Sequence, residues 1–120
     1  MLRKILAVDD SALIHQMYKL FLSRYKNCKL VSAMNGLEAL EKLGQEEGID
    51  LILLDINMPK VDGAQFCKFV KKNAMFKGIK VLFCSGEDRE KVARLATECG
   101  ADGYILKDEV LGKWVVDNAG

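Results

Sequence analysis

The segment LILLD at residues 51–55 carries a clear signal of the fold. Its four apolar residues are continuous instead of alternating with polar ones, which is typical of a strand buried on both faces of a parallel sheet. A carboxylate follows directly where that strand ends. Residues 5–8 near the N-terminus read ILAV in the same way, and Asp9 and Asp10 follow them. The sequence therefore predicts two buried strands that each end in acidic residues.

Strand-like and helix-like segments alternate along the rest of the chain. Short runs rich in leucine and β-branched residues recur at residues 4–8, 29–33, 50–54, 79–84 and 103–106. A segment of helical period follows each run, and such connections are too long for hairpins. We predict one (βα)5 domain of the α/β class over residues 1–120, in which helices cover both faces of a parallel sheet.

The helical segments carry apolar residues at the spacing of one helix face. We expect the following sets to face the sheet: Leu13, Met17, Leu20 and Phe21; Leu37, Leu40 and Leu43; Phe66, Phe69 and Val70; Val92, Leu95, Ala96 and Cys99. Gly100 is placed to end the fourth helix. A short fifth helix, interrupted by Gly112, is predicted over residues 109–118.

The composition excludes several classes of protein. The 120 residues are 50% hydrophobic and 29% charged, and the formal net charge is +1. A nearly neutral chain has no global field to attract nucleic acid or an anionic membrane. The apolar runs are far shorter than the roughly 20 residues of a membrane-spanning helix, and no apolar signal core follows the N-terminus. We expect a cytoplasmic protein that binds neither membrane nor nucleic acid.

The cysteines and the single histidine give no sign of a zinc site. Cys28, Cys67, Cys84 and Cys99 are scattered without a C-x-x-C pair, which indicates reduced thiols in a cytosolic protein. His15 is far from every cysteine in sequence. We expect His15 to be an ordinary residue on the surface of a helix.

Polar and charged residues follow the predicted strands at the positions where ligands bind in open α/β sheets, beyond the strand carboxyl ends. Asp9 and Asp10 follow the first strand, Asp55 the third, Ser85 the fourth and Lys107 the fifth. These groups converge on one edge if the first and third strands are neighbours. Three carboxylates close together repel one another by about 4 kcal/mol per pair at roughly 4 Å, so either a proton or a divalent cation must compensate.

The donor set favours one kind of chemistry. Oxygen ligands without nearby cysteine or histidine favour Mg²⁺ or Mn²⁺, and a metal beside a nucleophilic aspartate suits phosphoryl transfer. Each group also has a simpler interpretation, because Asp10 or Ser11 can cap a helix and Asp55, Asn57 and Pro59 can form a turn. Groups that suit one metal and phosphoryl site follow four separate strands, and this favours the functional interpretation over capping and turn roles.

Together these residues resemble the receiver domain of two-component response regulators, and especially the single-domain chemotaxis type. The matching segments cover essentially the whole chain and read VDDS at 8–11, LLDINMP at 53–59, VDG at 61–63, SG at 85–86 and GADGYILK at 100–107. The resemblance implies a flavodoxin-like, doubly wound sheet with strand order 2-1-3-4-5.

The resemblance also implies a phosphoacceptor and a metal site. Asp55 would accept a phosphoryl group from a sensor histidine kinase or a phosphotransfer protein. Asp9, Asp10, Asp55 and the main-chain carbonyl of Asn57 would hold Mg²⁺. The protein would then be a signalling switch that catalyses its own phosphotransfer and dephosphorylation, and not an enzyme acting on a metabolite.

Other residues would carry the signal outward. By the same resemblance, Ser85 and Lys107 would bind phosphoryl oxygens, and Tyr104 would report the phosphorylated state through its rotamer. The added charge of a phosphoryl group would shift the face formed by the fourth helix, fifth strand and fifth helix toward a form that binds a downstream protein.

The chain departs from the family pattern after Lys107. Asp108 stands where the family usually has proline, so we predict a trans peptide bond between residues 107 and 108. Ser85 replaces the commoner threonine. Asn57 and Glu87 match the chemotaxis type at two positions that tune lifetime, and both side chains can orient an attacking water. We therefore expect a short-lived phosphorylated state.

Three other functions compete with this interpretation. A Mg²⁺-dependent phosphohydrolase of similar topology would carry D-x-D after the first strand and an inserted cap, whereas this chain has adjacent Asp9 and Asp10. A flavin or nucleotide binder would need a glycine-rich loop, which the chain lacks. A receiver that has lost phosphorylation would not need the intact acidic residues. The kinase, the target, the oligomeric state and whether the domain stands alone are left open.

Overall fold

A computed structural model of the chain describes residues 3–23, 26–55, 63–85 and 88–106. The elements within these ranges are β1 (Arg3–Val8), α1 (Ala12–Leu22), β2 (Cys28–Ala33), α2 (Gly36–Gln45), β3 (Ile49–Asp55), α3 (Gly63–Lys72), a 3-10 turn η1 (Ala74–Phe76), β4 (Lys80–Ser85), α4 (Arg89–Cys99) and β5 (Gly103–Leu106). Every predicted strand is present. The predicted helix over residues 109–118 and the peptide bond between residues 107 and 108 lie outside the described ranges.

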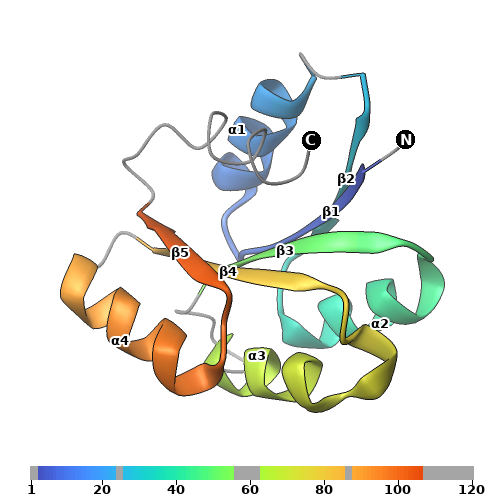
Figure 1. The fold of residues 1–120 in the computed structure, drawn as a ribbon. Helices are drawn as coiled ribbons and strands as arrows, with labels where there is room; N and C mark the ends of the chain where they lie inside the picture. Colours follow the sequence, from blue (N-terminus) through green and yellow to red (C-terminus); the bar gives the residue numbers. More distant parts are fainter. Residues whose placement is uncertain (1–2, 24–25, 56–62, 86–87, 107–120) are drawn as a thin grey trace.

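The strands form one parallel sheet in the order β2-β1-β3-β4-β5 (Figure 1). This confirms the flavodoxin-like α/β fold that the resemblance implied. The first strand, β1, lies inside the sheet between β2 and β3. The chain therefore adds β2 on one side of β1 and then adds β3, β4 and β5 in turn on the other side. The carboxyl ends of β1 and β3 are therefore neighbours at one edge of the sheet.

Helices cover the two faces of the sheet unequally in the described part of the chain. Figure 1 shows α2, α3 and α4 on one face and α1 on the other. Alternate strand residues divide between these faces, since successive side chains of a strand point to opposite sides. In β1, Leu6 and Val8 belong to the core under α2, α3 and α4, whereas Ile5 and Ala7 belong to the core under α1.

The prediction for the inward face of α1 was wrong. The buried residues of this helix are His15, Tyr18 and Leu22, whereas Leu13 is 65% exposed and Leu20 is 73% exposed. Apolar side chains occur on nearly all sides of this helix, so periodicity alone did not select the face that meets the sheet. The expectation that His15 lies on the surface was also wrong, because this side chain is only 8% exposed.

The faces of α2 and α3 were predicted in part. In α2, Leu43 is buried as expected, but Leu37 is 54% exposed. Small residues, Gly36 and Ala39, meet the sheet instead and allow the helix to lie close to it. In α3, Phe66 and Val70 are buried as predicted, whereas Phe69 is 45% exposed and its ring lies 6.3 Å from that of Phe76.

The prediction for α4 was correct. Val92, Ala96 and Cys99 are buried, and Leu95 is partly buried against the same core. Gly100 ends the helix with a φ of 76°, a left-handed conformation that glycine adopts without steric cost. The turn that follows returns the chain to β5. Within the described residues, none of the helices combines the length and apolar character that a membrane span requires.

Candidate functional site

Sheet register brings Asp9 and Asp55 to the same edge and the same face. Ala7 of β1 is paired with Leu53 of β3, and both belong to the core under α1. Asp9 and Asp55 come two residues later on the two strands, which is one full side-chain period. Both carboxylates therefore continue the face that α1 covers, beyond the last apolar residue of each strand.

The three predicted acidic residues form one cluster. Asp9, Asp10 and Asp55 each have one carboxylate oxygen that lies within 4.8 Å of the corresponding oxygen of the other two residues. Asp9 is 1% exposed and Asp55 is 4% exposed, whereas Asp10 is exposed. The cluster is thus a pair of buried carboxylates with a third at its opening to solvent.

Local hydrogen bonds fix the turn that carries two of these carboxylates. The Asp9 amide donates to the Ala33 carbonyl at 3.1 Å, and Asp9 Oδ1 accepts from the Ser11 amide at 2.9 Å. Ser11 Oγ caps α1 by accepting from the Ile14 amide at 3.4 Å. The prediction that Asp10 or Ser11 caps this helix is therefore confirmed for Ser11, and the Asp10 carboxylate is not needed as the cap.

The residues present suit a hard divalent cation. Buried carboxylates are unfavourable unless a positive charge or hydrogen bonds compensate them. The described cluster offers carboxylate oxygens and contains neither a histidine nor a cysteine ligand. Such an oxygen-only set is typical of Mg²⁺ and Mn²⁺ sites.

A buried phenol that no sequence motif indicated lies close to this cluster. Tyr18 of α1 is 3% exposed, and burial raises its pKa above the ordinary value for tyrosine. Cys84, Asp9 and Asp55 raise the pKa of Tyr18 further. Tyr18 is therefore a neutral hydroxyl at neutral pH. Nothing in its spacing along α1 distinguished it from an apolar core residue.

Tyr104 lies on the opposite face of the sheet, beside α4. It is partly buried against the core there, and the Arg89 guanidinium carbon lies 5.8 Å from the centre of its ring. Arg89 Nη1 also donates to the Tyr104 hydroxyl at 3.4 Å. No sequence motif pointed to Arg89, which is one of several charged residues at the start of α4.

The remaining predicted site residues are not placed. The backbone of Ser85 ends β4, but its side chain lies outside the described part of the structure. Asn57, Glu87 and Lys107 also lie outside the described residues.

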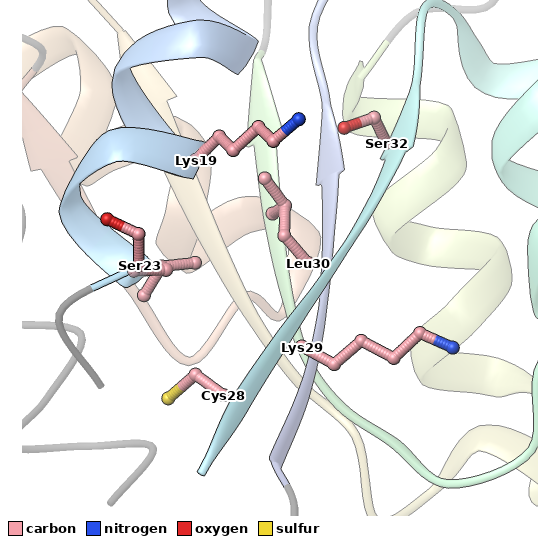
Figure 2. A pocket seen from close by; sticks show the side chains of 7 residues that line it. Lys19, Ser23, Cys28, Lys29, Leu30 and Ser32 are labelled. Atoms are coloured by element: carbon pink, nitrogen blue, oxygen red, sulfur yellow. The ribbon is translucent and has the colours of Figure 1, made fainter. Parts of the chain in front are cut away.

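A groove of about 470 Å³ between α1 and β2 lies away from the acidic cluster. Figure 2 shows Lys19 reaching toward the Ser32 side of the groove, whereas Lys29 extends to the other side of β2. There Lys29 Nζ lies 3.7 Å from a Glu46 carboxylate oxygen. None of the described residues that line the groove carries a carboxylate.

Comparison with known proteins agrees with this geometry. The family model described as "Response regulator receiver domain" matches residues 5–114. Protein PilG of Pseudomonas aeruginosa is 31% identical over 113 residues, which is 91% of this chain and 82% of PilG. The transcriptional regulatory protein ResD of Bacillus subtilis is 39% identical over 104 residues, but this chain covers only 41% of ResD.

Solved structures show the same likeness over nearly the full length. The chemotaxis protein CheY4 of Vibrio cholerae superposes with a TM-score of 0.84 at 29% identity, and the match covers 98% of this chain and 95% of CheY4. The family match, the parallel sheet order and the acidic cluster at the ends of β1 and β3 all agree. This chain therefore belongs to the response regulator receiver domain family of two-component systems.

Proposed function

We propose that this protein is a phosphorylation switch in which Asp55 accepts a phosphoryl group from a phosphohistidine of a sensor kinase or phosphotransfer protein. The observation that carries the proposal is the acidic cluster, in which Asp55 ends a central strand beside Asp9 and Asp10.

The chemical step forms one bond and breaks another. A carboxylate oxygen of Asp55 attacks the phosphorus, the phosphorus–nitrogen bond breaks, and its electron pair stays on the imidazole, which takes up a proton. The product on this chain is an acyl phosphate.

Asp9, Asp10 and Asp55, together with the main-chain carbonyl of Asn57, would hold Mg²⁺. A bound Mg²⁺ supplies charge neutralisation of the phosphoryl oxygens. Ser85 and Lys107 would bind those oxygens from the ends of the fourth and fifth strands. Asn57 and Glu87 would orient the water that hydrolyses the acyl phosphate, which makes the phosphorylated state short-lived.

The signal would leave through the face formed by α4, β5 and the segment after it. Tyr104 and Arg89 lie together on that face, and Arg89 holds the phenol through a ring contact and a hydrogen bond. Phosphorylation replaces the single negative charge of the Asp55 carboxylate with the roughly two negative charges of a phosphoryl group, which would shift Tyr104 and favour the form that binds a downstream protein. We expect the phosphotransfer and the binding of the downstream protein to take place in the cytoplasm.

Intact-mass spectrometry after incubation with acetyl phosphate tests the proposal. We expect a gain of one phosphoryl group in Mg²⁺ and none in EDTA. Asp55→Asn should abolish the gain. Asp50→Asn is the matched control, because Asp50 lies at the opposite end of β3, outside the acidic cluster, and should leave the gain intact.

Two outcomes would contradict the proposal. Phosphorylation that persists in Asp55→Asn would assign the phosphoacceptor elsewhere. Turnover of small phosphoesters that survives Asp55→Asn would favour the Mg²⁺-dependent phosphohydrolase.

In 3-fluorotyrosine NMR spectra of the same samples, the Tyr104 signal should shift on phosphorylation of the wild type and stay unchanged in Asp55→Asn.

A further inference from the structure

His15 binds the peptide group that joins two of the proposed metal ligands. Its Nε2 lies 2.8 Å from the main-chain carbonyl oxygen of Asp9, and the contact is buried. A carbonyl oxygen only accepts hydrogen bonds, so the Nε2–H of His15 is the donor. The histidine that the sequence analysis placed on the surface therefore lies directly beside the acidic cluster.

The Asp9 carbonyl shares one rigid plane with the Asp10 amide, because the peptide bond between them does not rotate freely. The direction of this carbonyl therefore fixes where the Asp10 Cα lies relative to Asp9. The Asp9 amide is separately fixed by the Ala33 carbonyl at 3.1 Å. His15 donates the hydrogen bond that the Asp9 carbonyl accepts. This carbonyl lies one residue beyond the end of β1 at Val8.

Stability alone gives a poor account of histidine at this position. The other ring nitrogen, Nδ1, is buried and has no hydrogen-bond partner among the described residues. An unpaired buried polar atom is unfavourable, whereas an apolar side chain facing the core would avoid that cost. The Nε2 bond to Asp9 is the interaction that a histidine provides here and an apolar residue does not.

We propose that His15 is a positioning residue for the metal site: its Nε2–H fixes the Asp9–Asp10 peptide plane and so places both carboxylates for a divalent cation. This inference rests on the proposed function, since it assumes that the cluster binds Mg²⁺. Partners that orient metal ligands through hydrogen bonds typically change metal affinity about 10- to 100-fold when they are removed.

The test is the affinity for Mg²⁺, measured by isothermal titration calorimetry on the full chain without any phosphodonor. His15→Gln keeps an N–H donor at the same number of bonds from Cα as Nε2. His15→Met has similar length and no donor. Leu22→Ala is the control for stability, since Leu22 is buried at the far end of α1 and is outside the acidic cluster.

We expect His15→Met to weaken Mg²⁺ binding about 10-fold, while His15→Gln stays within about threefold of the wild type. Leu22→Ala should bind Mg²⁺ like the wild type although it unfolds more easily. In metal-free NMR spectra, the amide signals of Asp10 and Ser11 should shift more in His15→Met than in His15→Gln.

Three results overturn the inference, and they are distinguishable from one another. If the wild type binds Mg²⁺ and His15→Met binds it equally well, the positioning role fails and the metal site stands. If the wild type shows no Mg²⁺ binding, the metal site fails and the positioning role fails with it. Equal weakening in His15→Met and His15→Gln would also contradict the role of the Nε2–H donor.

Discussion

At the scale of single residues, the three carboxylates differ in how firmly the fold holds them. Asp9 is fixed by hydrogen bonds at its amide, its carbonyl and one carboxylate oxygen. Asp55 is held by β3, in which it is the last residue. Asp10 is exposed, and its backbone follows the peptide group that is fixed at Asp9. Its carboxylate adds a third negative charge beside the buried carboxylates of Asp9 and Asp55. The cluster is therefore electrostatically unfavourable without a cation.

Asp10→Asn should stabilise the metal-free protein. The change keeps the shape of the side chain and removes repulsion of about 1 kcal/mol per charge pair at an exposed site. Urea unfolding in EDTA should show this increase in the free energy of unfolding. Saturating Mg²⁺ should then stabilise the wild type more than the variant, because the variant has lost a ligand. A variant less stable than the wild type in EDTA would contradict the view that the carboxylates repel one another.

At the scale of the elements, α1 determines how the site is covered. Its inward residues His15, Tyr18 and Leu22 lie beside the acidic cluster or on the core beneath it. Its outward residues include Leu13 and Leu20, which are mostly exposed. The helix therefore has two apolar faces, and only one of them stabilises the described fold.

Two leucines of α1 provide a matched test of this orientation. Leu22→Ala should lower the free energy of unfolding by about 2 to 5 kcal/mol, because it leaves a cavity in the core. Leu20→Ala should change it by less than about 0.5 kcal/mol, because that side chain is 73% exposed. Chemical denaturation measures both values. Equal losses in the two variants would show that α1 is rotated from the orientation described above.

At the scale of the whole molecule, two apolar cores on the faces of one sheet hold the fold together, and the described residues contain no disulfide. None of the four cysteines forms a disulfide, and Cys67, Cys84 and Cys99 are buried. Burial raises the pKa of the Cys67 thiol to about 12. Burial also raises the pKa of Cys28, although Arg3 opposes the shift. The thiolate forms of Cys28 and Cys67 are therefore scarce in the native protein at neutral pH.

Alkylation should report this protection directly. Iodoacetamide near neutral pH should modify the native protein slowly, and Cys28 should react before the three buried cysteines, because it is the partly exposed one. In urea, all four should react, and peptide mass mapping identifies the sites. Rapid modification of Cys67 in the native protein would show that the core under α3 opens far more readily than its burial indicates.

The strands, the class of fold, the acidic residues at the strand ends and the resemblance to receiver domains could all be predicted from the sequence. These features are local, because a run of apolar residues, its length and the group that follows it can be read along the chain. Four features followed only from the packed helices: the buried face of α1, the bond of His15 to the Asp9 carbonyl, the place of Tyr18 near the cluster and the contact of Arg89 with Tyr104. Each of these depends on how a helix is rotated against the sheet. The connection from β1 and the packing of the whole core set the rotation of α1. Periodicity does not predict this rotation when a helix has apolar residues on nearly all sides.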